Sequence, residues 1–564
     1  MKRAVLAAAI LAIAVVGLAI LTLPPRQLAL TPFGDGTVAG VVHIHTNRSD
    51  GRSSPAEIAE AAAHAGLKFV IFTDHGDATR PPDPPTYRSG VLCLDGAEIS
   101  TSGGHYLAID MPAAPYPLAG EPRDVVEDVR RLGGFGVAAH PDSPKPELQW
   151  TGWSTPFDGI EWLNPDTSWR VHAAGGWRSR FSLLESLLHY PMRPAETVAS
   201  LLTGAERIVA QWAPLAATRR IVALAGADAH AKLALRNADP GDNRLSLPLP
   251  SYEASFRAST VHARVDRPLS GDAAGDAAAL MRAVRAGHLY IAVDGFATPP
   301  AFEFTASNML GTVHEGDELG AGGPVTLHIR SDAPAGMQTT IYRDGAVLAV
   351  RSEQELTVTA AADPAIYRVE IRSPERVWLY SNPIYVRAAS AEPPKPRPAA
   401  VDTRPLFTGV TDFWRVENDA TSSGQLEMAS SETGPELTVR YRLGQDPARP
   451  PHVALIWGTN VPPGIPGYDR LEVTARADRP MRVIVELRVA DLVASPRRWR
   501  RSLYLDRFDA TRTLFFDEFT PAPGTPDAHP TLADVNAVQF FVETTNTKPG
   551  TEGKIWIKSA ALQK

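Results

Sequence analysis

Cysteine is nearly absent from this chain. Cys93 is the single cysteine among 564 residues, so an intramolecular disulfide and a zinc site built from several thiolates are both excluded. The simplest expectation for Cys93 is a small, buried, apolar side chain. Any metal site in this chain must be built from histidine and carboxylate ligands.

The sequence also lacks the motifs of several large functional classes. It has neither a G-x-S-x-G nucleophile elbow nor a phosphate-binding P-loop. Basic residues form only short clusters, such as residues 497–501, and the formal net charge is −7. A diffuse negative charge of this kind indicates a solvated surface, so nucleic acid is not an expected partner.

The length and composition indicate several globular domains. A chain of 564 residues is too long for one hydrophobic core, and about three domains are expected. Hydrophobic residues make up 44% and charged residues 21%, as in globular proteins. The 50 prolines and 43 glycines predict many turns and linkers.

The N-terminus, residues 1–30, has the pattern of a signal anchor or a signal peptide. Lys2 and Arg3 precede Ala4–Leu23, twenty residues without a charge, which is enough for a helix to cross a bilayer core of roughly 30 Å. No A-x-A cleavage site follows, which favours an uncleaved anchor. Positive charges before the segment keep the N-terminus inside. We therefore expect an exported protein, membrane-anchored with its catalytic domain in the periplasm, or secreted if the signal is cleaved.

Residues 43–55, HIHTNRSDGRSSP, carry the first functional signal. They follow a predicted buried strand, on which His43 and His45 point to the same face because they are two residues apart. Asp50 opens a turn, and Ser54 with Glu57 forms a capping box that begins a helix. Two histidines on one face can share one ligand.

Residues of the metal-ligand type recur at the ends of later predicted strands. Strand Leu67–Thr73 is followed by Asp74 and His75. The further strands and their polar residues are Val91–Leu94 with Glu98, His105–Ile109 with His105, Phe135–Ala139 with His140, and Ile221–Ala225 with Asp228 and His230. Active sites of parallel α/β folds lie at the carboxyl ends of the strands. The pattern predicts a β/α barrel with a metal site.

Six motifs in this part of the chain resemble, in sequence and in order, those of the PHP (polymerase and histidinol phosphatase) metallohydrolases. They are HIHT…SDG, TDHG, GAEI, GHYLAID, AAHP and GADAH. The resemblance covers residues 40–235. It implies an α/β fold, a distorted, TIM-like (β/α)7 barrel over residues 31–297, and two or three bridged divalent metal ions.

The resemblance also implies how the ligands are shared. His43, His45, Glu98 and Asp228 would hold one metal. Glu98, as a bridge, would hold a second with His105 and His140. Asp50, His75 and His230 would hold a third, whose occupancy stays open because some members have histidine in place of Asp50. Glu98, Asp228 and His230 are the expected catalytic residues.

The donor set limits the metal and suggests the reaction. Imidazole and carboxylate ligands without thiolate suit Zn, Mn or Fe, and the sequence does not choose among them. Bridged ions lower the pKa of a shared water towards ~7, which gives a hydroxide nucleophile. The expected function is an exported metal-dependent hydrolase that cleaves ester, carbamate or phosphoester bonds.

The substrate is the open question. The chain resembles the CehA/McbA (carbaryl hydrolase-like) branch, which implies a small-molecule or glycan-linked ester or carbamate substrate. The alternative is a phosphatase or phosphodiesterase of the PHP type, since Arg48, Arg52 and Lys145 lie near the motifs and could meet a phosphate. His172, in the stretch 166–220, is a further candidate for the substrate pocket.

Beyond residue 297 short alternating strands replace the β/α pattern. Residues 298–388 predict a small immunoglobulin-like sandwich, residues 389–403 a proline-rich linker, and residues 404–564 a jelly-roll sandwich resembling carbohydrate-binding modules. Trp414, Trp457 and Trp499 are either a sugar platform or core residues. The hypothesis of another class is a cell-surface glycan-binding protein whose metal barrel is not catalytic.

Overall fold

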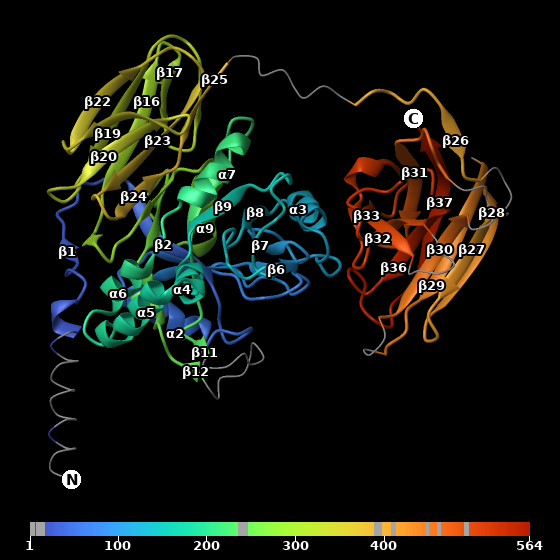
Figure 1. The fold of residues 1–564 in the computed structure, drawn as a ribbon, viewed down its shortest axis with the longest axis horizontal. Coiled ribbons are helices and arrows are strands. Elements are labelled where there is room, and N and C mark those ends of the chain that lie inside the picture. Colours follow the sequence, from blue (N-terminus) through green and yellow to red (C-terminus); the bar gives the residue numbers. More distant parts are fainter. Residues whose placement is uncertain are drawn as a thin grey trace. The chain divides into compact units, whose positions relative to one another are not determined.

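The computed structural model describes residues 6, 17, 19–234, 246–388, 397–407, 413–431, 434–446, 450–458, 464–489 and 496–564. These residues form a mixed α/β protein with many β-sheets. The contacts divide the chain into two compact units (Figure 1). Unit 1 comprises Met1–Ala113 and Glu121–Glu392, and unit 2 comprises Ala114–Gly120 and Pro393–Lys564.

A closed ring of strands forms the centre of unit 1. Its strands are β2 (Thr37–Ile44), β3 (Phe69–Phe72), β5 (Val91–Asp95), β6 (Ala97–Thr101), β7 (Gly104–Ile109), β8 (Phe135–Ala138), β9 (Gly159–Leu163) and β10 (Val222–Ala229). Strand β2 pairs in parallel with β3 and with β10, β3 pairs with β5, and β9 pairs with β8 and β10. Parallel pairing brings the carboxyl ends of these strands to one end of the ring.

One strand of the ring runs against the others. Strand β7 is antiparallel to both β6 and β8. It follows β6 after only Ser102 and Gly103, and a link this short permits antiparallel pairing alone. Strands β5 and β6 are separated by Gly96 alone, and an isolated parallel bridge joins His75, beyond β3, to Glu98 in β6. The alternation of strand and helix therefore stops between β5 and β7.

Helices cover the outside of the ring (Figure 1). Helix α2 begins at the predicted capping box, which is confirmed: the Ser54 side chain accepts from the backbone N–H of Glu57, and the Glu57 side chain accepts from that of Ser54. Helix α9 ends at Gly287, whose φ of 72° is left-handed. The helices are α2 (Pro55–His64), α3 (Pro122–Arg131), α4 (Pro165–Ala174), α5 (Trp177–His189), α6 (Pro194–Leu201), α7 (Glu206–Ala216), α8 (Tyr252–Phe256) and α9 (Ala273–Ala286).

Short strands complete this part of unit 1. Strands β13 and β14 form an antiparallel pair, and β13 also pairs with β2. The strands are β1 (Leu28–Ala29), β4 (Thr86–Arg88), β11 (Leu233–Ala234), β12 (Ser246–Leu247), β13 (Thr260–Arg264), β14 (Leu289–Ala292) and β15 (Ala297–Thr298). Cys93 is buried beside Val70 and Val91, as a small apolar residue would be.

A small β-sandwich follows the ring within the same unit. Its strands are β16 (Phe302–Asn308), β17 (Gly311–His314), β18 (Glu318–Gly320), β19 (Val325–Ser331), β20 (Gln338–Arg343), β21 (Ala346–Arg351), β22 (Glu355–Ala360), β23 (Ala365–Arg372), β24 (Val377–Ser381) and β25 (Ile384–Arg387). Strand β24 pairs with β14. Backbone hydrogen bonding is therefore continuous across the expected boundary between residues 297 and 298. The expected linker falls mainly on 389–396, outside the described residues.

Unit 2 contains two facing sheets around an apolar core. One has the strand order β28-β29-β37-β31-β34, with β26 paired to β37, and the other has the order β27-β30-β36-β32-β33-β35. Trp414, Trp457 and Trp499 all belong to the core between them, exposed by 6%, 5% and 0%. The expectation of a sugar platform from these three tryptophans is wrong, because their strands turn them inward; the core alternative is confirmed.

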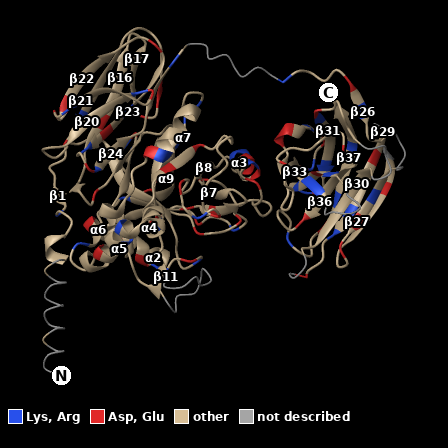
Figure 2. Cartoon of the chain, viewed as in Figure 1, with Lys and Arg blue, Asp and Glu red and all other residues tan. Residues whose placement is uncertain are grey.

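The elements of unit 2 are β26 (Thr403–Pro405), β27 (Trp414–Asn418), β28 (Ser423–Ser431), β29 (Gly434–Arg442), β30 (His452–Gly458), β31 (Arg470–Ala477), β32 (Met481–Val489), β33 (Arg497–Leu505), β34 (Ala510–Phe515), η1 (Phe516–Glu518), β35 (Thr520–Pro521), β36 (Ala537–Glu543) and β37 (Glu552–Gln563). Figure 2 shows basic and acidic residues interspersed along the elements of both units. This distribution fits the diffuse charge seen in the sequence.

The predicted anchor, Ala4–Leu23, falls mostly on residues that the structure does not describe. In the described part of the chain, no helix is both long enough and apolar enough to cross a membrane.

Candidate metal centre

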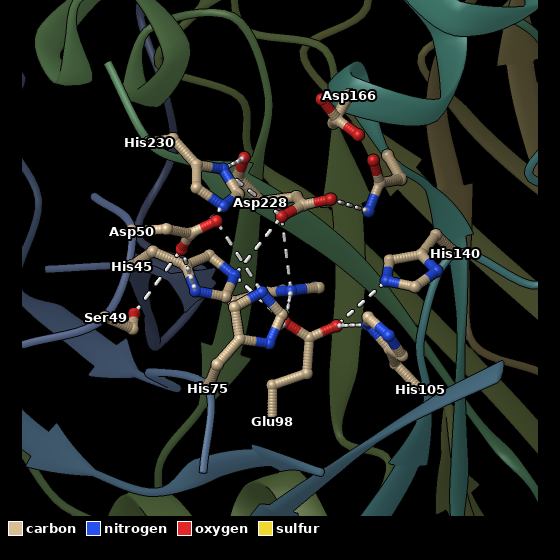
Figure 3. A network of polar contacts seen from close by, with 12 residues as sticks. His45, Ser49, Asp50, His75, Glu98, His105, His140, Asp166, Asp228 and His230 are labelled. Carbon is tan, nitrogen blue, oxygen red and sulfur yellow. Dashed lines mark hydrogen bonds and ion pairs between the residues drawn. The ribbon is translucent and has the colours of Figure 1, made fainter. Parts of the chain in front are cut away.

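Nine histidine and carboxylate side chains meet at the carboxyl end of the ring (Figure 3). They come from at least five different strands or the turns that follow them, so no local stretch of sequence holds the whole set. The nine are His43, His45, Asp50, His75, Glu98, His105, His140, Asp228 and His230. Parallel strand pairing explains why residues up to 187 positions apart lie together.

Glu98 lies at the centre of the cluster. Its Oε1 lies 2.7 Å from Nδ1 of His105 and 2.9 Å from Nε2 of His140. Its Oε2 lies 3.0 Å from Nε2 of His45 and 3.2 Å from Nε2 of His43. One carboxylate thus faces two separate groups of histidines, which is the arrangement that a bridging ligand requires.

A second carboxylate, Asp50, joins the outer histidines. Its Oδ1 lies 3.4 Å from Nδ1 of His45 and 3.2 Å from Nε2 of His230, and its Oδ2 lies 3.8 Å from Nε2 of His75. His75 also faces Glu98, at 3.3 Å from Nδ1 to Oε2. The outer group is therefore contiguous with the inner one.

Several ligand atoms inside the cluster lack hydrogen-bond partners among the described residues. Nε2 of His43, both ring nitrogens of His45 and Oε2 of Glu98 are buried and unsatisfied. Leaving such atoms unpaired in a protein interior is costly, and they lie within 4.8 Å of further donors of the same kind. A set of nitrogen and oxygen donors around buried, unpaired atoms fits divalent cations.

Hydrogen bonds on the outer side of the rings orient the inner nitrogens. Nδ1 of His140 donates to the carbonyl oxygen of Leu148 at 2.9 Å, and Nδ1 of His230 donates to that of Asp228 at 2.9 Å. Nδ1 of His43 lies 2.6 Å from Oε1 of Glu161. With the proton held on Nδ1, each ring presents an unprotonated Nε2 to the centre, as metal-binding histidines do.

The pKa values reflect how closely the charges are packed. Burial lowers the pKa of His45, but the nearby carboxylates of Asp228 and Glu98, 3.3 and 3.0 Å from its Nε2, outweigh burial and raise it to about 10. Burial raises the pKa of Glu98, but the charge of His43 and hydrogen bonds from His105 and His140 hold it well below its usual value. The carboxylates therefore stay ionised and demand positive charge nearby, which either protons or metal ions supply.

The backbone is strained at three of the nine residues. His43, His140 and Asp228 have φ values of 67°, 29° and 45°, which residues other than glycine rarely adopt. Each such conformation costs on the order of 1–3 kcal/mol and persists only where the surroundings impose it. Strain of this kind is concentrated at functional sites.

An outer layer of residues that the sequence motifs did not reveal supports the cluster. Glu161, in β9, contacts His43, and its Oε2 accepts from the backbone N–H of His140 at 2.7 Å. Asn164 donates to Oε2 of Glu161 at 2.9 Å. Gly226 makes room for this carboxylate, since a Cβ there would lie 1.8 Å from Oε1 of Glu161. A lone glutamate in the apolar strand Ile160–Leu163 was the signal available in the sequence.

Two further residues hold the turn that carries Asp50. The carboxylate of Asp74 accepts from the backbone N–H of Thr46 at 2.7 Å and from the Ser49 hydroxyl at 2.6 Å. The Tyr252 hydroxyl donates to the carbonyl oxygen of His45 at 2.8 Å. Asp74 was visible in its motif, whereas nothing near Tyr252 in the sequence indicates its contact with a residue 207 positions away.

The four residues expected to bind substrate lie apart from the nine clustered side chains. The guanidinium of Arg48 pairs with Asp83 and lies 3.6 Å from Asp95. Arg52 reaches His230 through its backbone N–H, at 3.0 Å from the carbonyl oxygen. Lys145 is 44% exposed and lies 4.0 Å from Glu147. Nε2 of His172 lies 3.1 Å from the carbonyl oxygen of Leu201. Their role in substrate binding stays a prediction.

A cavity of about 280 Å³ lies against the cluster. Asp228 and His230 form part of its wall, and helices α4, α5 and α6 supply half of the other lining residues. Its lining is mainly apolar and includes Trp169, Leu183, Leu187, Val198, Leu201 and Leu249. The size is near the lower end for small-molecule sites. An apolar group of modest size would fit beside the ligands.

No family model matches the chain. It is 27% identical over 116 residues to an uncharacterised protein of Methanocaldococcus jannaschii, covering 18% of this chain and 67% of that protein. Among solved structures, the chain is similar to a two-domain protein of Bacteroides vulgatus that contains a predicted PHP-like metal-dependent phosphoesterase. The two are 13% identical, the match covers 64% of this chain and 99% of that one, and the TM-score is 0.29.

The chain is also similar to a family 11 carbohydrate-binding module of Clostridium thermocellum, whose structure was solved with a β-1,3-1,4-mixed-linked tetrasaccharide. The identity is 15%, the match covers 29% of this chain and 96% of that one, and the TM-score is 0.24. These likenesses are too distant to place the chain in a family. The function is therefore argued from the geometry of the nine-residue cluster.

Proposed function

We propose that this chain is a metal-dependent hydrolase of the PHP type, exported and anchored by its N-terminal segment, that holds two or three divalent cations at the nine-residue cluster. The observation that carries the proposal is the set of buried, unpaired ligand atoms of His43, His45 and Glu98, which face one another within a ring of further ligands. A structural role alone would leave these atoms unsatisfied.

Each part of the cluster has a role that follows from its contacts. His43, His45 and Asp228 would hold one ion, and His105 and His140 would hold a second, with Glu98 facing both groups. Asp50, His75 and His230 would hold a third. Such ions lower the pKa of a coordinated water and polarise the oxygen of a bound ester or phosphate.

The chain's own residues would prepare the site for this chemistry. Glu161 and the carbonyl oxygens of Leu148 and Asp228 keep the Nδ1 protons of three histidines away from the centre. His230 borders the cavity, and in a chain with only two ions its Nε2, 3.2 Å from Asp50, would be available to hold or pass on a proton for a leaving oxygen.

The apolar cavity favours esters and carbamates with a small apolar group over sugar phosphates. Its wall adjoins Asp228 and His230, so a substrate bound there would present its scissile bond to the cluster. Arg48, which could have met a phosphate, is already paired with Asp83. Phosphoester hydrolysis is the second candidate, because the same ligand set would serve it equally.

A panel of chromogenic substrates tests the proposal. The full-length, metal-loaded protein is compared on aryl esters, aryl carbamates, aryl phosphates and phosphodiesters. Turnover of the esters or carbamates, abolished by a chelator, is the expected result. Preference for phosphates would transfer the assignment to the second candidate. No turnover of any class with metal bound would favour a glycan-binding protein with a non-catalytic barrel.

A further inference from the structure

Helix α5 carries an exposed apolar face that the hydrolase site does not use. Trp177, Phe181, Leu184 and Leu188 follow the spacing i, i+4, i+7, i+11 and therefore lie on one face of the helix. Their side chains are 74%, 46%, 60% and 41% exposed. A continuous strip of this kind marks a surface for an apolar partner, whereas single exposed apolar residues are ordinary.

The opposite side of the same helix faces the substrate cavity. Leu183, Ser186 and Tyr190 line that cavity beside Asp228 and His230. Leu187 also lines it and is at the same time 48% exposed. Helix α5 therefore separates the cavity from the exposed face, and Leu187 reaches both.

The apolar N-terminal run enters the folded unit at the C-terminal end of α5. Oγ1 of Thr22 lies 2.9 Å from Nε2 of His189, the last residue of the helix. The guanidinium of Arg193 donates to the carbonyl oxygen of Pro24, and the backbone N–H of Gln27 donates to Glu196. Figure 1 shows α5 and α6 at the place where the chain from the N-terminus joins unit 1.

Further exposed apolar residues lie in the entering segment and just beyond α5. Ile20 and Leu21 are 57% and 85% exposed, and Met192, just beyond α5, is 47% exposed. Residues 4–23 carry no charge and are long enough to span a bilayer. If they do so, residue 22 lies at the membrane surface, and its contact with His189 brings the end of α5 to that surface.

We infer that the face of α5 formed by Trp177, Phe181, Leu184 and Leu188 lies in the surface of a lipid bilayer. The inference rests on the proposed membrane segment and not on the hydrolase activity. Its composition fits an interfacial helix, with tryptophan, phenylalanine and leucine on one face and Arg178 at the edge of that face, where its guanidinium lies 5.4 Å from the centre of the Trp177 ring. The cavity that adjoins the metal centre would then open close to the lipid, which favours amphiphilic substrates.

A fluorescent label tests this contact in the full-length protein reconstituted in phosphatidylcholine vesicles. Cys93 is the single cysteine, is 4% exposed, and burial raises the pKa of its thiol to about 11. An introduced cysteine is therefore labelled selectively with a polarity-sensitive dye. The variants are Trp177→Cys and Leu184→Cys, with Leu310→Cys as control, since Leu310 is 62% exposed in the β16–β17 turn at the other end of unit 1 (Figure 1).

Dyes at positions 177 and 184 should emit at shorter wavelength than the dye at 310, and lipids carrying a spin-label quencher should dim them by roughly two-fold. The dye at 310 should be unaffected by the quencher. Equal behaviour at all three positions would overturn the inference. A blue-shifted dye that the lipid quencher cannot reach would also overturn it, because residues 4–21 or a second copy would then cover α5. Failure of the chain to float with the vesicles would do the same.

Discussion

The ring of unit 1 and the sandwich of unit 2 each bury a glutamate, with opposite consequences. Glu98 is surrounded by imidazoles, which hold its pKa well below the usual value although burial alone would raise it. Glu486, in β32, has a raised pKa because burial dominates, even though Nε of Arg500 lies 2.7 Å from its Oε2. The comparison shows that burial alone does not identify a functional carboxylate; the kind of neighbour does.

The positive charge that faces the buried carboxylate differs in kind between Glu98 and Glu486. Glu486 has a guanidinium beside it, which is a permanent positive charge. The neighbours of Glu98 are histidines, which can either carry protons or give nitrogen ligands to a metal ion. A buried cluster of histidines and carboxylates therefore has two charge states, and a cation selects one of them.

The largest expected difference comes from the matched substitutions Glu98→Gln and Glu486→Gln. Glu98→Gln should lose bound metal and lower kcat/KM by more than about 100-fold. Glu98 would contact the metal directly, and even residues that only orient metal ligands typically cost about 10–100-fold when they are changed. Glu486→Gln should leave both unchanged and alter the free energy of unfolding of unit 2 by no more than about 1 kcal/mol, because burial already disfavours the Glu486 charge and Arg500 keeps a second partner in Glu543 at 3.7 Å. Metal analysis, kinetics and urea unfolding of both variants check this. Equal effects on activity would abolish the distinction.

The next largest effect is expected at the support of His43. Glu161→Gln should lower metal affinity or kcat/KM by roughly 10–100-fold, because the amide holds the His43 ring less firmly. Gly226→Ala should act in the same direction, since its methyl group would displace the Glu161 carboxylate. Titration with Zn²⁺ or Mn²⁺ and steady-state kinetics measure the change. Unaltered affinity in both variants would mean that Glu161 does not orient His43.

The sequence predicted which histidines and carboxylates come together, but not the residues that support them. His43 and His45, or Asp228 and His230, reveal themselves because strand geometry puts residues two apart on one face. Glu161 and Tyr252 act through contacts across the ring, which depend on strand order and on the space left at Gly226. The tryptophans of unit 2 were ambiguous for the same reason, because the direction a strand turns its side chains depends on its partner sheet.

The pH dependence of stability offers a smaller contrast away from the metal centre. Burial raises the pKa of Asp294 to about 7, while the Thr260 and Thr298 hydroxyls donate to it. The folded chain then binds a proton that the unfolded chain has already lost, so stability falls between about pH 4 and pH 7, by up to roughly 1.4 kcal/mol per pH unit.

Asp294→Asn should flatten that part of the profile. Urea unfolding of unit 1 at several pH values, with chelator present in all samples so that metal release does not contribute, checks this. Asp363→Asn, at an aspartate that is 78% exposed, is the control and should follow the wild-type slope. An unchanged slope in the Asp294 variant would show that this carboxyl titrates normally.

The smallest effect is expected from removing the C-terminal sandwich. Every ligand lies between His43 and His230, so a chain of residues 31–388 should bind metal and turn over small chromogenic substrates with kcat within about two-fold of the full chain. If the sandwich tethers the enzyme to a polymer, its loss should weaken apparent affinity for that polymer alone. Loss of chromogenic turnover in a folded, metal-loaded truncation would show that unit 2 contributes to the pocket.

Metal stoichiometry coupled to activity tests the central claim most directly. The full-length protein is stripped with a chelator, then titrated with Zn²⁺, Mn²⁺ or Fe²⁺ while bound metal and hydrolysis are measured on the same samples. The nine-residue cluster predicts two or three ions per chain, with activity that appears as they bind and is absent beforehand. Full turnover by the metal-free protein, or binding of no more than trace metal, would contradict the assignment of this cluster as a catalytic metal centre.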